Sequence, residues 1–202
     1  MNITESEYNI LHTFLTRIAP VDNKLFDKIK PCMKKKTFKK GDVILREGKT
    51  ETQSNIVLKG VVHQFVYDNE TPVTSNLTPR GLVFNSIKSY IEESPSSEIQ
   101  EAITDVELLC IKKHDIETLA RANHQFSYAM YKIHEDILLH RERRMFLLQH
   151  RSPSKRYVLF HEIIKRSNWL LEGAPAKYIA SYLNMTPQQY SKEKNAFEKA
   201  KK

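Results

Sequence analysis

Glycine is scarce in this chain, and its placement constrains the fold more than any other feature of the sequence. The 202 residues include five glycines, at positions 41, 48, 60, 81 and 173, so four of the five fall within one 41-residue stretch. Short runs rich in Val, Ile, Phe and Tyr lie between them, at 42–45, 56–58, 61–67 and 82–84. Short apolar runs separated by turn residues at near-regular spacing are typical of antiparallel barrels and sandwiches. The sequence therefore predicts an antiparallel β-domain here.

Three further patterns extend this domain. Asp68-Asn69 lies between two apolar runs and predicts a tight hairpin turn. Residues 102–111 add another strand or a pair of strands. Before the strands, residues 6–18 carry apolar side chains at the spacing of an amphipathic helix.

A long helical stretch without Gly or Pro begins near Asp115 and ends near Arg151. If it is continuous from Arg121 to Gln149, the helix extends roughly 43 Å at 1.5 Å per residue. Six side chains recur along it at intervals of three and four: Met130, Ile133, Ile137, His140, Arg144 and Leu148. This spacing forms a narrow seam, which predicts a dimer interface between two copies of the helix. The alternative is that the seam packs on its own domain.

Ser152-Pro153-Ser154 ends this helix, because Pro cannot continue the hydrogen-bond ladder and Ser can cap the next helix. We therefore place a domain boundary here. Beyond it the sequence predicts a helix that reaches Arg166, a short link that ends at Glu172-Gly173, and two further helical segments.

The two terminal segments form the most informative motif. The first, residues 175–183, is followed by Asn184, which tolerates the left-handed conformation of a tight turn between helices. Thr186, Pro187 and Gln189 then supply an N-cap, a proline at the first helical position and a Gln at the third, as in a capping box. A helix, a short turn and a capped helix together predict a helix-turn-helix, whose second helix contacts base edges in the major groove.

Polar side chains share one face of the second helix, where Gln188, Lys192 and Asn195 are spaced at i, i+4 and i+7. Tyr190 and Phe197 share the opposite, buried face. Gln can bond adenine and Lys can reach guanine acceptors. The predicted DNA-binding residues are Thr186, Gln188, Gln189, Lys192, Asn195, Lys177 and Lys194, with Lys199, Lys201 and Lys202 as further phosphate contacts. The alternative is a solvated face on an ordinary helical hairpin.

The charge distribution agrees with this motif. Residues 1–118 hold 16 Lys and Arg against 17 Asp and Glu, whereas residues 119–202 hold 16 against 7. A basic end of this kind indicates a polyanionic partner, either nucleic acid or a membrane surface. No run approaches the roughly 20 apolar residues of a membrane helix, and the first residues lack a signal pattern. We therefore expect a cytoplasmic protein with no membrane partner.

Few features favour catalysis or a cofactor. Two cysteines, Cys32 and Cys110, are too few for an iron–sulfur cluster, and we expect both to be small buried hydrophobes. The eight histidines show no ligand-like spacing, and the sequence has no G-x-S-x-G, phosphate-loop or H-E-x-x-H motif. We predict no enzyme activity, no metal and no cofactor.

These residues resemble the transcription regulators of the cyclic-AMP receptor protein/fumarate-nitrate regulator (Crp/Fnr) family. Residues 39–48, KKGDVILREG, resemble the family's K-G-x-x-I-x-x-x-G turn, and Val57 to Gly60 its V-x-x-G. Residues 77–81 are similar to L-x-P-G-D, with Arg80 inserted. Residues 178–187 are close to its I-A-x-x-L-G-x-S/T helix-turn-helix. The resemblance implies an α+β chain with a β-roll sensor at 1–120, a dimerisation helix at 121–151 and a DNA-binding domain at 152–202.

The sequence also departs from the family. Members that bind cyclic AMP carry a Gly-Glu pair and an Arg-Ser pair where this chain has Asn85-Ser86 and Ser96-Ser97. A buried phosphate without a cationic partner lacks its main charge-assisted bonds, so control by cyclic AMP is not expected. Asn85, Ser86, Ser96 and Ser97 are candidates to line a pocket for another effector, or they form an ordinary polar loop. The cysteine cluster of oxygen-sensing relatives is missing, and haem ligation by His63 is not expected.

The resemblance places Gln188 and Lys192 where relatives contact bases with Glu and Arg, so base preference is expected to differ. Asn184 replaces the usual turn glycine, and no wing hairpin is expected after the second helix. We predict a homodimeric regulator that binds a pseudo-palindromic operator, with RNA polymerase and a small-molecule effector as further partners. An effector would act by moving the long helix and the Ser152-Pro153 junction. The alternative is a small-molecule or cyclic-nucleotide binding module that has weak or lost DNA recognition.

Overall fold

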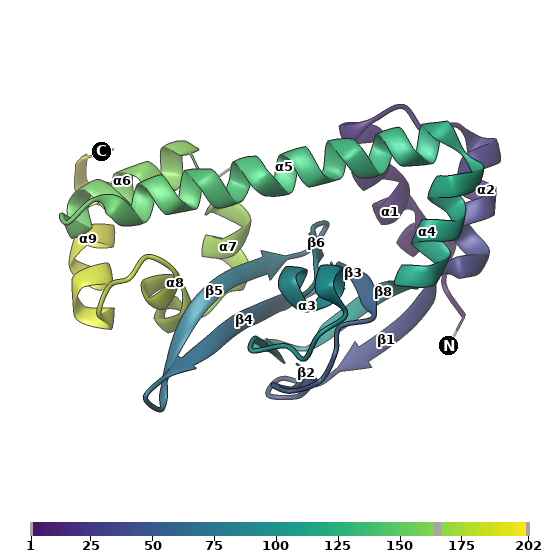
Figure 1. Cartoon of the computed structure of the whole chain (residues 1–202). Helices are drawn as coiled ribbons and strands as arrows, with labels where there is room; N and C mark the ends of the chain where they lie inside the picture. The colour runs from purple at the N-terminus through teal and green to yellow at the C-terminus, as the bar shows by residue number, and fades with distance from the viewer. Residues whose placement is uncertain (1, 164–166, 201–202) are drawn as a thin grey trace.

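The computed structural model describes residues 2–163 and 167–200. A β-roll occupies the first half of the chain, a long helix lies across it, and a group of shorter helices follows (Figure 1). The predicted ends at Arg166, Lys201 and Lys202 lie outside the described residues. In the described part, no helix is both long and apolar enough to span a membrane.

The predicted antiparallel β-domain is confirmed as two four-stranded sheets. One sheet has the order β1-β8-β3-β6 and the other β2-β7-β4-β5, and every strand pair is antiparallel. Val57, Val62, Phe84 and Leu108 belong to the apolar core of the roll. The strands are β1 Lys34–Phe38, β2 Val43–Leu45, β3 Gln53–Lys59, β4 Val61–Asp68, β5 Thr71–Pro79, β6 Val83–Phe84, β7 Ile99–Ala102 and β8 Val106–Lys112.

Two local predictions shift slightly. The run 102–111 divides between the end of β7 and most of β8. The β4–β5 hairpin turns at Asn69 and Glu70, whose φ angles are +45° and +69°, one residue later than predicted. Two successive positive φ angles define the tight turn whose twist matches paired strands.

Gly60 shows why glycine punctuates this roll. It joins β3 to β4 with a φ of +84°, and a Cβ there would lie 2.2 Å from the carbonyl oxygen of Asp105. The β7–β8 connection therefore approaches the backbone at a distance that no side chain would permit. Gly41 has a similar φ of +93°, but a Cβ there would meet nothing within 4 Å.

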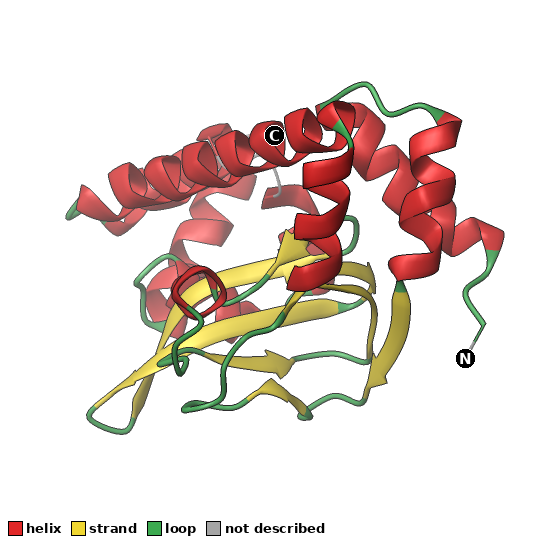
Figure 2. Cartoon of the chain, turned by 45° about the vertical axis from the view of Figure 1, so that its right-hand side comes forward, coloured by secondary structure: helices red, strands yellow, loops and turns green. Residues whose placement is uncertain are grey.

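Helices cover one side of the roll (Figure 2). The predicted N-terminal helix is confirmed as α1 Glu5–Ile18, which begins with a capping box between Thr4 and Glu7. With α2 Asn23–Ile29 and the short turn η1 Lys30–Cys32, it packs on β3 and β8 around Leu15, Leu25 and Leu109. The short helix α3 Ile87–Glu92 lies in the connection between β6 and β7.

The long helix is not continuous from Arg121. The chain forms α4 Lys113–Ala122 and then α5 His124–Gln149, because Asn123 adopts an extended conformation and caps the second helix. Its Oδ1 accepts from the backbone N–H of Phe126 at 3.0 Å. The 26 residues of α5 span roughly 39 Å. The predicted long helix therefore begins three residues later than expected.

The break at Pro153 is confirmed, and four helices follow it. They are α6 Pro153–Ile163, α7 Ser167–Gly173, α8 Ala176–Tyr182 and α9 Pro187–Ala200. The link expected before Glu172-Gly173 is instead the helix α7. Leu170 on α7 is fully buried, and this apolar anchor explains why the segment is ordered as a helix against the core.

One apolar core joins these helices to the β-roll. Val61 and Leu77 from the strands and Ile103 from the β7–β8 connection belong to the same buried cluster as Phe160 and Tyr182 from the C-terminal helices. Helices α7 and α8 both contact β5. The two halves of the chain therefore share packing rather than meeting only at the end of α5.

We predict that Gly60→Ala lowers the free energy of unfolding far more than Gly41→Ala. Both variants place a side chain at a positive φ, which costs about 1–2 kcal/mol. Gly60→Ala also forces the β7–β8 connection to move, for a total loss of about 3 kcal/mol or more. Urea denaturation of the two variants measures the difference. Equal losses would contradict the close approach at Gly60.

Candidate DNA-binding surface and effector cavity

The terminal motif consists of two helices, α8 and α9, joined by a short turn. Asn184, between α8 and α9, has a φ of +51°, so the left-handed turn predicted for it is confirmed. The backbone N–H of Gln189 donates to Thr186 Oγ1 at 3.1 Å, and the backbone N–H of Thr186 donates to Gln189 Oε1 at 3.0 Å. This reciprocal capping box fixes the start of α9. Gln189 is thus held by the cap and is less free to contact a base.

The polar face of α9 is open to solvent. Gln188, Lys192 and Asn195 are exposed, whereas Tyr190 is buried and Phe197 packs partly against the core, as predicted. The remaining lysines of the predicted set are partly engaged. Lys177 lies over the ring of Tyr178, with its Nζ 4.8 Å from the ring centroid, and Lys194 lies 3.9 Å from the Glu198 carboxylate.

Arg156 holds this motif in place, and the sequence analysis assigned it no role. Its side chain is buried and donates to the carbonyl oxygens of Leu183 at 2.8 Å and Asn184 at 2.9 Å. It also donates to His150 at 2.6 Å and Arg151 at 3.0 Å, just beyond the end of α5. One guanidinium therefore satisfies backbone acceptors at two helix ends. The sequence signal that could have identified this role is the position of Arg156, three residues after the helix break at Pro153.

The first helix of the motif docks on the roll through a buried polar chain. Ser181 on α8 accepts from Thr74 on β5 at 2.7 Å, and Thr74 lies 2.9 Å from His63 Nε2 on β4. The His63 ring stacks on Phe65 and meets Tyr178 edge-on. Burial, with the nearby charge of Lys177, lowers the pKa of His63 to about 4. His63 is therefore a neutral interface residue.

Arg144 makes the strongest link between α5 and this interface. Its Nη2 donates to the carbonyl oxygens of Thr74 at 2.7 Å and Tyr182 at 3.1 Å, and its guanidinium lies 4.5 Å from the centre of the Tyr182 ring. The Tyr182 hydroxyl lies 3.2 Å from His140 Nε2. Burial lowers the pKa of Arg144, but arginine stays protonated in proteins.

These contacts show where the predicted dimer seam lies. Ile133 is buried against the α1 core, and Met130 and Ile137 pack on the same core. Leu148 packs on the C-terminal core, while His140 and Arg144 contact α8. All six seam residues therefore contact their own chain, as the alternative interpretation expected, but of these six only Ile133 is buried and the other five are partly exposed. Their role in a dimer stays a prediction.

A different set of side chains is exposed on α5. Six large apolar residues there are 45% to 69% exposed: Tyr128, Tyr131, Leu138, Leu139, Met145 and Phe146. Tyr128, Tyr131, Leu138 and Met145 fall on one repeat of three and four residues, continued by Glu135 and Glu142. We call these six apolar residues the outer stripe. Its spacing is that of a coiled-coil seam.

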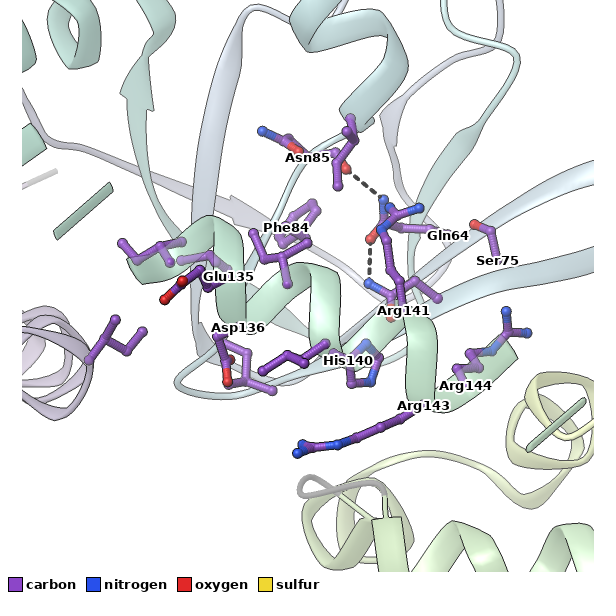
Figure 3. A pocket seen from close by; sticks show the side chains of 18 of the residues that line it. Gln64, Ser75, Phe84, Asn85, Glu135, Asp136, His140, Arg141, Arg143 and Arg144 are labelled. Carbon is purple, nitrogen blue, oxygen red and sulfur yellow. Dashed lines mark hydrogen bonds between the residues drawn. The ribbon is translucent and has the colours of Figure 1, made fainter. Parts of the chain in front are cut away.

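A cavity of about 770 Å³ lies between the inner face of α5 and strands β4, β5 and β6. Gln64, Ser75 and Asn85 line its roll side, and Arg141, Arg143 and Arg144 line its helix side (Figure 3). Phe14 from α1 and Trp169 from α7 close other parts of the wall. A cavity of this size is typical of small-molecule sites.

The predicted effector residues divide between this cavity and the adjoining loops. Asn85 lines the cavity, and its carbonyl oxygen accepts from Gln64 at 3.0 Å. The hydroxyls of Ser86 and Ser96 are buried and lie 2.8 Å from each other, so they satisfy one another. Ser97 is exposed. Only Asn85 of the four residues therefore belongs to the cavity.

Gln64 and Asn76 are the cavity residues that the sequence analysis missed. Gln64 donates to Glu98 at 2.8 Å, Ser75 donates to the same carboxylate, and Asn76 donates to Gln64 at 2.9 Å. Burial raises the pKa of Glu98. Polar residues at buried positions of apolar strands were the signal that could have identified this wall. Among residues 2–163 and 167–200, no group of three or more His, Cys, Asp or Glu could hold a metal ion.

Comparison with known proteins agrees with this geometry. The sequence of residues 35–123 matches the family of cyclic nucleotide-binding domains. The β-roll is therefore similar to cyclic nucleotide-binding domains in sequence. No curated protein matches the chain.

Solved structures extend the likeness of this domain to the rest of the chain. FixK2 from Bradyrhizobium japonicum superposes with a TM-score of 0.69 at 19% identity, over 83% of this chain and 85% of that one. A CooA mutant from Carboxydothermus hydrogenoformans has a TM-score of 0.63 at 15% identity, over 85% of this chain and 79% of that one. A cyclic nucleotide-binding domain from Methylobacillus flagellatus has a TM-score of 0.61 at 15% identity, over 68% of this chain and 79% of that one. The chain therefore has the fold of Crp/Fnr-type regulators.

We predict that Arg156→Met lowers the free energy of unfolding by about 3 kcal/mol, because it leaves buried carbonyl oxygens without donors. Lys155→Met is the matched control, since Lys155 is the exposed neighbour on the same helix. Thermal denaturation of both variants tests the assignment. A loss no larger than that of the control would show that Arg156 does not hold the turn.

Proposed function

We propose that this protein is a homodimeric, sequence-specific DNA-binding transcription regulator of the Crp/Fnr type that is not controlled by cyclic AMP. The observation that carries the proposal is the solvent-open polar face of the capped helix α9, with Gln188, Lys192 and Asn195 in line. A Gln and a Lys on one helical face can bond adenine and guanine edges in the major groove. Lys177, Lys194 and Lys199 supply candidate phosphate contacts near this face.

The outer stripe of α5 is the proposed dimer interface. Monomeric proteins rarely leave a contiguous row of large apolar side chains open to water. A parallel pair of α5 helices would bury the stripe of both copies and bring two α9 helices into one complex. Two-fold symmetry then predicts a pseudo-palindromic operator with half-sites roughly 34 Å apart.

The cavity is the proposed effector site, and its wall supports a route to α8. His140 and Arg144 line the cavity and also contact Tyr182, two residues before the turn at Asn184. A ligand that binds one arrangement of these two side chains better than another shifts the position of α8. The absence of an arginine or glutamate at 85–86 and 96–97 supports an effector other than cyclic AMP.

Selection of bound DNA from a random pool tests DNA recognition. We expect a palindromic consensus, and an affinity that falls by about 10³ or more between 50 and 200 mM salt if six or more phosphates are contacted. Gln188→Ala is expected to weaken binding to the selected site by about 5- to 150-fold and to relax one position of each half-site. Lys59→Met, an exposed change on the roll, is the control.

Sequence-indifferent binding without a palindrome would reject the regulator proposal. It would instead favour a small-molecule binding module that has lost DNA recognition.

Leu138→Lys should convert the protein to a monomer, because it places a charge at the most exposed position of the outer stripe. Val43→Lys is the matched control, since Val43 is an exposed apolar residue on β2 of the roll. Analytical ultracentrifugation measures both. A Leu138→Lys dimer would locate the interface elsewhere.

A further inference from the structure

The cavity beneath α5 adjoins a second cavity of different chemistry. This second cavity has a volume of about 340 Å³ and lies among α1, α3, α4, α5, β3 and β8. Its walls are mainly apolar and include Leu11, Leu109, Ile116 and Phe126. Seven residues line both cavities, among them Phe84, so a polar space and an apolar space meet along one wall.

The first cavity has an excess of positive charge. Its lining includes five Arg or Lys side chains but two carboxylates, Glu135 and Asp136, and Glu135 is already paired with Lys132. Arg141 extends from α5 toward the roll, close enough to Glu98 to affect its pKa (Figure 3). Arg141 is exposed, so its guanidinium is open to a ligand from solvent.

One buried hydrogen-bond donor of this wall lacks a partner among the described residues, and one partly exposed amide does so too. The Nε of Arg144 is buried without an acceptor in the described part of the chain. The side-chain amide of Asn85 also makes no hydrogen bond to a described residue, although its backbone carbonyl does. Unsatisfied buried donors carry an energetic cost, and an acceptor-rich ligand removes it. Guanidinium groups bind carboxylates and related anions with two parallel hydrogen bonds.

We propose that the two cavities together bind an amphiphilic organic anion. Its anionic group lies at Arg141 and Arg144, and its apolar body occupies the chamber between α1 and the β3–β8 pair. This inference deepens the proposed regulator function by naming the class of its effector, and it rests on that proposal only for the regulatory role of the ligand.

The same walls disfavour a cyclic nucleotide. Ribose hydroxyls and a purine edge need several hydrogen-bond partners, whereas the second cavity offers mostly Leu, Ile, Met and Phe side chains. An apolar tail instead binds this chamber favourably, because each methylene that leaves water makes the free energy of binding more negative.

Ligand binding at Arg144 reaches the helix-turn-helix directly. Arg144 donates to the carbonyl oxygen of Tyr182, so an anion that draws the guanidinium into the cavity competes with this contact. The ligand would thereby alter the docking of α8 on β5, which Ser181 and Thr74 also maintain.

Trp169 provides a direct test in the full-length protein. It is the sole tryptophan of the sequence and lines the first cavity, so its fluorescence reports occupancy. We expect decanoate, used below its micelle concentration, to give a saturable change, with decanol and acetate each at least about 10-fold weaker. From butanoate to decanoate the affinity should rise by up to about fourfold per methylene.

Arg141→Met is expected to weaken decanoate binding by about 10-fold or more and to leave decanol binding unchanged, because it removes the charged guanidinium and keeps an unbranched apolar stem. Arg151→Met, an exposed change outside both cavities, should bind decanoate as the parent does.

Equal binding of decanol and decanoate, an affinity that does not depend on chain length, or tighter binding of cyclic AMP would overturn the proposal. These measurements contain no DNA. A failed DNA selection with intact decanoate binding would thus reject the regulator and keep the ligand site, and the reverse result would reject the ligand site alone.

Discussion

The guanidinium of Arg144 is the point at which three parts of this molecule meet. From the inner face of α5 it bonds a strand carbonyl at Thr74 and a helix carbonyl at Tyr182, and it stacks on the Tyr182 ring. Each contact is charge-assisted or desolvated, so each is stronger than its equivalent in water. The apolar core around Leu77, Leu147 and Phe160 encloses this junction. Because of the Arg144 contacts, α5 joins the roll to α8 on its inner face, while its other face is exposed to solvent.

The two faces of α5 consequently do different work. The inner face closes the cavities, and the outer stripe is exposed. Leu139 and Met145 of the outer stripe also line the first cavity. Apolar residues on each face of α5 recur at intervals of three and four residues, because this is the spacing of any set of side chains on one side of a helix. The sequence pattern therefore identified a row of packing residues on α5, but it did not indicate whether they pack on their own chain or on a second copy. In the structure the seam residues contact α1 and α8 of their own chain.

Local chemistry was predicted well because its causes are local. The positive φ at Asn184, the Thr186–Gln189 capping box and the break at Pro153 depend on residues within a few positions of one another. The strands between the glycines could also be predicted, because the apolar runs and the turns that separate them are local features of the sequence. The cavity could not be predicted in this way, because Gln64, Asn85 and Arg141 come from three elements far apart in the chain. The candidate residues Ser86 and Ser96 do not line it, and their hydroxyls lie 2.8 Å from each other.

Periodicity, turn residues and caps encode the β-roll, the order of the helices and the polar face of the capped helix α9, so these features could be read from the sequence. Three features emerge only from the folded chain: the core that the roll shares with the terminal helices, the interruption of the long helix at Asn123, and the arginines of α5 that line a cavity. These features depend on contacts between residues distant in sequence. Such contacts are set by how apolar faces pack together, and no single segment carries that information.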